Sequence, residues 1–153
     1  MAEVSIQPEL FGIEGGGRPT LKGTHCRSCS RRSFPPSGTC PWCGGEDTEQ
    51  VELSRTGTLW GWTAVSAAPP GYRGPVPYGF GIVELPADGL RLITRLTVAD
   101  PTTLTYGQPV ELVADALHTD EETGATVVSW AFAPAAPAPA GFAPTAPRTP
   151  TDG

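Results

Sequence analysis

The sequence contains a single lysine, no long apolar run, and no cysteine outside one short stretch of its 153 residues. No apolar segment approaches the ~20 residues that a membrane-spanning helix needs, so we expect no membrane segment. Ten Lys and Arg against sixteen Asp and Glu give a formal charge of −6, which argues against a protein built mainly to bind nucleic acid. Residues 1–17 have no signal-peptide pattern, so we expect a cytoplasmic protein with reduced thiols.

Helical periodicity of useful length is also missing, whereas turn-forming residues are abundant. The chain has 19 glycines and 18 prolines, far above ordinary usage, which favours β-turns, loops and a low-complexity segment. The apolar share of 39% suffices for one modest hydrophobic core, not for two. An all-β chain is therefore predicted.

All four cysteines lie in two C-x2-C pairs, Cys26/Cys29 and Cys40/Cys43. A pair at this spacing forms a tight turn whose sulfurs point at one ion, and two pairs complete the four-thiolate cage that Zn²⁺ prefers. Between the pairs, residues 30–39 hold prolines and a glycine that let the chain double back. We predict a structural zinc ribbon whose metal ligands are Cys26, Cys29, Cys40 and Cys43.

Other interpretations of the four cysteines differ in how much the residues support them. Iron in a rubredoxin-like site would use the same ligands, and the sequence does not separate it from zinc. Two disulfides are disfavoured by the expected reducing compartment, and a redox C-x-x-C is expected at the start of a helix rather than among turns. His25 could replace a sulfur, but four thiolates already complete the set, so we interpret it as a solvated neighbour.

Five short segments with β-type sequences follow the cysteines, at residues 58–66, 78–85, 90–98, 109–117 and 125–132. Alternation predicts that Trp60 and Trp62 share one face of the first strand. On the third strand it places Arg91, Ile93 and Arg95 on an outer face, opposite the leucines. On the last strand, Val128, Trp130 and Phe132 should point together into the core. Because closing the sheet hides its edges, we predict a five-stranded OB-fold barrel.

These patterns divide the chain into four parts. Residues 1–19 form an N-terminal docking segment, whose Gly15-Gly16-Gly17 is a flexible joint to the ribbon. Residues 20–50 form the rubredoxin-like zinc ribbon, and residues 51–134 form the OB-fold domain. Residues 135–153 are a Pro/Ala-rich tail that we expect to be disordered, because it buries too little apolar surface to offset its ordering entropy.

Several motifs within residues 20–134 resemble a known family. They are Phe34-Pro35-Pro36 ahead of Cys40-Pro41-Trp42-Cys43, Gly57-Thr58-Leu59, the run Pro77-Tyr78-Gly79-Phe80-Gly81-Ile82-Val83-Glu84-Leu85, Gly107-Gln108-Pro109-Val110-Glu111, and Phe132-Ala133-Pro134. The family is the acyl-CoA-associated proteins with a rubredoxin-like zinc ribbon and a C-terminal OB-fold. Residues 1–19 match it less well, since members often carry a longer N-terminal helix, and the tail matches nothing.

The resemblance implies a small, non-catalytic accessory subunit that packs on a thiolase-like or hydratase catalytic subunit as a hetero-oligomer. Such a subunit helps to shape the CoA-ester site of its partner, and a thiolase-type acyltransferase is the favoured partner. The residues agree with this expectation. The four cysteines are committed to a closed metal cage, and His118 lies in an acidic turn, so we expect no active site in this chain alone.

A CoA ester presents an adenine ring and phosphates, which call for cationic donors and an aromatic or apolar wall. The residues proposed to contact CoA or the partner are Arg27, Arg31, Arg32, Tyr72, Arg73, Tyr78 and Phe80. Simpler interpretations exist for each group. The ribbon arginines could offset the charge of a zinc tetrathiolate, Phe80 and the two tryptophans of the first strand could pack in the core, and Tyr72-Arg73 could be an exposed loop tip.

An alternative function is a single-stranded nucleic-acid-binding OB module, which stacks bases on aromatic side chains in a basic groove. Arg91 and Arg95 beside an aromatic face would form that groove. The net charge of −6, the single lysine and the lack of basic residues in the last two strands weigh against it.

Overall fold

The computed structural model describes residues 3–14 and 18–135, and within them every regular element except one short 3-10 helix is a strand. This confirms the predicted all-β class. The elements are β1 (Glu3–Ser5), β2 (Phe11–Glu14), β3 (Arg18–Cys26), β4 (Arg32–Ser33), β5 (Thr48–Glu52), β6 (Thr56–Val65), β7 (Tyr78–Leu85), β8 (Leu90–Leu96), η1 (Pro101–Thr103), β9 (Pro109–Thr119) and β10 (Thr126–Pro134). In the described residues no helix has the length and apolar character that crossing a membrane requires.

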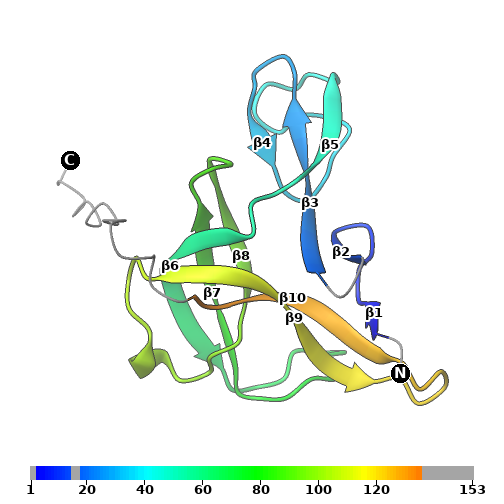
Figure 1. Cartoon of the computed structure of the whole chain (residues 1–153), viewed down its shortest axis with the longest axis vertical. Helices are drawn as coiled ribbons and strands as arrows, with labels where there is room; N and C mark the ends of the chain where they lie inside the picture. Colours follow the sequence, from blue (N-terminus) through cyan, green and yellow to red (C-terminus); the bar gives the residue numbers. More distant parts are fainter. Residues whose placement is uncertain (1–2, 15–17, 136–153) are drawn as a thin grey trace.

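Strands β6 to β10 close into a five-stranded barrel, as predicted (Figure 1). Its neighbours are antiparallel, in the order β9, β6, β7, β8, except that β10 runs parallel to β8 through the pair Phe132–Leu96. The long β9–β10 hairpin then closes the ring, because β9 also pairs with β6. At Gly57 the backbones approach so closely that a Cβ would meet the carbonyl oxygen of Glu84, which explains the glycine at this corner.

The expectation that Trp60 and Trp62 share a face is wrong, because β6 contains a bulge between Leu59 and Gly61. The extra residue shifts the alternation, so Trp60 turns outward and is 39% exposed, whereas Trp62 packs against the core. The indole of Trp60 stacks with the guanidinium of Arg91 on the outer face of the barrel, 4.5 Å from ring centroid to Cζ. Simple strand periodicity cannot reveal an inserted residue.

The ribbon consists of β3, β4 and β5, with β3 in the middle, and it projects from one end of the barrel (Figure 1). The N-terminal strands lie against both parts: β1 pairs in parallel with β10, and β2 forms a hairpin with β3. The joint expected at residues 15–17 and the tail from residue 136 onward lie outside the described residues.

One contiguous hydrophobic core joins the ribbon to the barrel. Phe11 from β2, Leu21 from β3 and Leu53 after β5 belong to the same buried cluster as the barrel residues. Trp130 of β10 extends this contact, with its ring centroid 6.1 Å from Phe11 and 6.0 Å from Phe34. The expectation of a single core is therefore met, because the ribbon and the barrel share one buried cluster.

A buried ion pair also fixes the ribbon to the barrel. The side chain of Asp88, in the β7–β8 turn, is only 2% exposed and pairs with Arg32 of β4. Its second carboxylate oxygen accepts a hydrogen bond of 2.6 Å from the backbone N–H of Ser54. The sequence patterns did not predict this role of the carboxylate.

We expect Asp88→Ala to lower the free energy of unfolding by about 2–3 kcal/mol, because it strands the Ser54 N–H and removes the partner of Arg32. The guanidinium of Arg32 is 37% exposed, so water screens part of the loss. Urea unfolding followed by circular dichroism measures the effect. The control is Glu84→Ala, which breaks an exposed pair with Arg91 and should cost less than about 1 kcal/mol. Equal midpoints for the two variants would contradict this role of Asp88.

Candidate metal centre and ligand-binding surface

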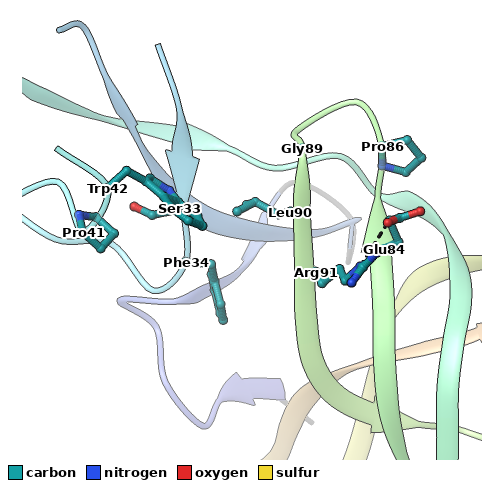
Figure 2. A pocket seen from close by; sticks show the side chains of 9 residues that line it. All are labelled: Ser33, Phe34, Pro41, Trp42, Glu84, Pro86, Gly89, Leu90 and Arg91. Carbon is teal, nitrogen blue, oxygen red and sulfur yellow. Dashed lines mark hydrogen bonds and ion pairs between the residues drawn. The ribbon is translucent and has the colours of Figure 1, made fainter. Parts of the chain in front are cut away.

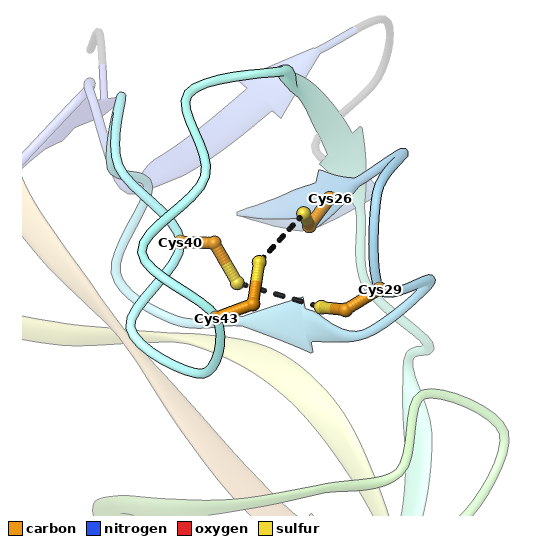
Figure 3. Close-up of side chains that lie close together, drawn as sticks. All are labelled: Cys26, Cys29, Cys40 and Cys43. Atoms are coloured by element: carbon orange, nitrogen blue, oxygen red, sulfur yellow. Dashed lines mark hydrogen bonds between the residues drawn. The ribbon is translucent and has the colours of Figure 1, made fainter.

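The four cysteine sulfurs converge on one point, as Figure 3 shows, and all lie within 4.8 Å of one another. Cys26 and Cys43 Sγ are 3.7 Å apart, and Cys29 and Cys40 Sγ are 3.6 Å apart. A tetrahedron with Zn–S bonds of about 2.3 Å has sulfur–sulfur edges of about 3.8 Å. Both the donor chemistry and the spacing of this group therefore fit a four-thiolate zinc site.

Two similar turns position the sulfurs. In each, the residue after the second cysteine has a left-handed backbone, with φ of 66° at Ser30 and 75° at Gly44. Its N–H donates to the carbonyl oxygen of the first cysteine, at 2.8 Å for Ser30 and 2.9 Å for Gly44. Backbone N–H groups also point at sulfur, such as Trp42 N at 3.4 Å from Cys40 Sγ. Gly44 was a sequence signal for this turn, because glycine adopts positive φ without strain.

The thiols perturb one another's ionisation. The backbone N–H of Cys29 lowers the pKa of the Cys26 thiol to about 6, against the cost of burial. At Cys29 the backbone N–H of Arg31 favours the thiolate, but burial and hydrogen bonds to the other cysteines outweigh it and raise the pKa to about 11. Four thiolates this close together need a cation to compensate their charge, so the donor set calls for a metal.

His25 does not belong to the sulfur group. Its Nδ1 lies 2.9 Å from Glu49 Oε2, on the neighbouring strand β5. Glu49 also accepts from Arg27, and the hydrogen bond from His25, followed by the charge of Arg27, lowers the pKa of the Glu49 carboxyl. The cluster is completed by Asp47, 2.8 Å from Arg27. These contacts place His25 in a polar network on the ribbon surface.

Among the described residues, two of the candidate CoA-contact arginines form ion pairs within the chain, and two do not. Arg27 pairs with two carboxylates and Arg32 pairs with Asp88. Arg31 and Arg73 are exposed and form no ion pair with any residue of 3–14 or 18–135. The guanidinium of Arg31 lies over the indole of Trp42, 4.8 Å from its centroid. Two of the four candidate arginines therefore remain available to a ligand.

The two candidate tyrosines lie together and enclose a third arginine. Tyr72 and Tyr78 have ring centroids 4.9 Å apart, and both rings contact the guanidinium of Arg95. Arg95 donates to the Tyr72 hydroxyl at 3.0 Å and to Asp115 at 3.1 Å. This cluster holds the proline-rich loop of residues 69–77 against the barrel, so Tyr72 is not a free loop tip. Phe80 lies on the same outer face, opposite Arg95.

A groove of about 680 Å³ lies between the ribbon and the β7–β8 hairpin (Figure 2). One wall comes from the ribbon and the other from the hairpin. The lining residues are Ser33, Phe34, Pro41, Trp42, Glu84, Pro86, Gly89, Leu90 and Arg91. None of them was among the candidate contact residues, because only the packing of ribbon on barrel brings them together.

The two arginines expected to form a nucleic-acid groove are both neutralised within the chain. Arg91 Nε lies 3.1 Å from Glu84, and Arg95 lies 3.1 Å from Asp115. Phosphate binding would require these pairs to open, so the geometry does not favour the nucleic-acid alternative.

Family models and known proteins match most of the chain. Residues 14–49 match the model described as "ChsH2, rubredoxin-like zinc ribbon domain", and residues 50–115 match "ChsH2, C-terminal OB-fold domain". The benzoylsuccinyl-CoA thiolase subunit BbsA of Thauera aromatica is 34% identical, over 83% of this chain and 85% of that protein. A probable enoyl-CoA hydratase alpha subunit of Thermomonospora curvata is also 34% identical, over 83% of this chain but 37% of that protein.

Among solved structures, the Ltp2-ChsH2(DUF35) aldolase contains a similar chain. Its sequence identity is 33% and its TM-score is 0.56, and the match covers 76% of this chain and 86% of that one. These relatives confirm the resemblance drawn from the motifs around the cysteines and at the strand ends. The chain therefore belongs to the ChsH2-type family, in which a rubredoxin-like zinc ribbon is followed by a C-terminal OB-fold domain.

Proposed function

We propose that this chain is a non-catalytic accessory subunit of a cytoplasmic acyl-CoA-processing enzyme, with a thiolase-type acyltransferase as its catalytic partner. The observation that carries the proposal is the match to a benzoylsuccinyl-CoA thiolase subunit along most of both chains. The relatives named as a hydratase subunit and as part of an aldolase assembly support the same class of role. The chemistry of the cysteines agrees, because a cage of four protein ligands leaves the metal no position for substrate.

The proposal includes contact with the CoA ester, made jointly with the catalytic subunit. Arg31 and Arg73 supply cations that no carboxylate of the described residues neutralises, and Tyr72, next to Arg73 in the chain, supplies an aromatic ring. Phosphates and an adenine ring fit such groups. Fold alone does not supply a function, so this part needs a direct test.

Reconstitution tests the proposal. The full-length chain is co-expressed with thiolase-type and hydratase-type catalytic subunits of its own genome, and complexes are purified by a tag on this chain. We expect a stable hetero-oligomer whose thioester turnover exceeds that of the catalytic subunit alone by about tenfold or more, because accessory contacts position the substrate. Arg31→Ala should raise the KM for the CoA ester with little change in kcat. Full activity of the catalytic subunit by itself would refute the accessory role.

A further inference from the structure

The outer face of the barrel beside the groove exposes several large apolar side chains. Ile93 of β8 is 66% exposed, and it lies directly across from Ile82 of β7. Trp60, turned outward by the bulge in β6, is 39% exposed, and Trp42 on the rim of the groove is 54% exposed. Bulges commonly re-aim a side chain, and exposed tryptophans are frequent at protein interfaces.

These residues form one continuous surface. Arg91 lines the groove together with Trp42, and its guanidinium stacks on Trp60. Ile93 follows Arg91 by two residues, so both side chains lie on the outer face of β8. We call the surface made by Trp42, Trp60, Ile82, Arg91 and Ile93 the two-tryptophan face. Figure 2 shows the groove where this face meets the ribbon.

The two arginines on the outer face of β8 form ion pairs within the chain. Arg91 pairs with Glu84, and Arg95, further along β8, pairs with Asp115. Among residues 3–14 and 18–135, a phosphate-bearing ligand would therefore meet no free cation on the barrel side of the groove. On the barrel side, an apolar surface around Trp60 and Ile93 with paired charges instead matches the anatomy of a protein–protein interface.

We propose that the two-tryptophan face is where the catalytic subunit docks, through an uncharged apolar segment of its surface that inserts a side chain into the groove between Trp42 and Leu90. The inference rests on the proposed function, and it identifies the face of this chain that contacts the catalytic subunit. Phe34, Pro41 and Leu90 supply apolar walls for the inserted side chain. CoA would be contacted by the free arginines, Arg31 on the ribbon and Arg73 on the proline-rich loop.

The test uses the reconstituted complex with the catalytic subunit that the unaltered chain binds. Ile93→Glu places an unpaired carboxylate in the centre of the docking face, and we expect the Kd, measured by surface plasmon resonance, to rise at least about tenfold. The matched control is Val76→Glu, which adds the same charge at an exposed valine of the proline-rich loop (44% exposed) and should change the Kd less than about twofold. Zinc content and melting temperature verify that both variants are folded.

A second measurement reports on the tryptophans directly. Acrylamide should quench the fluorescence of the free chain through its exposed indoles, and complex formation should protect them. Each outcome decides the inference. Undiminished binding by Ile93→Glu would overturn the docking face while the proposed function stands. Self-association of the isolated chain that Ile93→Glu abolishes would also overturn it. If the unaltered chain bound no catalytic subunit, the proposed function would fail and this inference with it.

Discussion

Cys40→Ser should reduce the bound zinc from one ion per chain to nearly none and abolish the folded ribbon, while the barrel keeps its β-type circular dichroism. Without the Cys40 sulfur, which lies 3.6 Å from Cys29 Sγ, only three of the four thiolates of the tetrahedron remain. In isolated zinc-finger peptides a structural zinc contributes ~10–16 kcal/mol at neutral pH, because the site forms only as the chain folds. We expect no other substitution in this chain to have a larger effect.

The barrel should nevertheless melt at a lower temperature in this variant. Leu21 at the base of the ribbon and Leu53 just beyond it are 0% and 4% exposed and belong to the same cluster as the barrel core. Unfolding the ribbon exposes them and removes the anchor that Arg32 provides to Asp88. Thr39→Ser, at an exposed neighbouring position, is the control and should keep both zinc and melting temperature. Elemental analysis that found full metal content in Cys40→Ser would contradict the ligand assignment, and iron in the native protein would correct the metal.

Phe11→Ala should lower the free energy of unfolding by about 3–5 kcal/mol, the usual cost of deleting a buried aromatic side chain. Phe11 is 0% exposed and lies where β2, β3 and β10 meet, with its ring against Trp130. Removing the ring leaves a cavity between the ribbon and the barrel, because the N-terminal segment is tied to the ribbon by the β2–β3 pairing and to the barrel by the β1–β10 pairing. Denaturant unfolding monitored by the fluorescence of Trp130 and the other tryptophans gives the midpoint.

Two further variants show whether the loss of stability in Phe11→Ala comes from the buried ring. Val4→Ala shortens a side chain in the same N-terminal segment that is 41% exposed, and it should change the stability by less than about 0.5 kcal/mol. Phe11→Leu should recover part of the loss, since it refills much of the cavity. An unaltered midpoint for Phe11→Ala would mean that the N-terminal segment contributes nothing to the core, and that residues 1–19 act only as an external docking segment.

The sequence by itself determined the metal site and the barrel. Two C-x2-C pairs specify a four-sulfur cage wherever a turn-rich chain brings them together, because the ligand geometry is local to each pair. The alternation of apolar and polar residues likewise predicted the strands 78–85 and 90–98, the second of which ends at Leu96, and the face on which Arg91 and Ile93 lie. These features depend on neighbours a few residues apart.

Only the tertiary structure decided how the ribbon and the barrel are joined. Three features depend on segments far apart in the chain. They are the bulge at Trp60, the buried ion pair of Asp88 with Arg32, and the contact of Arg95 with two tyrosine rings. The groove and the docking face arise from the same packing, since their residues come from both parts of the protein. A periodic pattern reports which side of a strand is buried, but the partner of each side chain is set by long-range packing that the pattern does not encode.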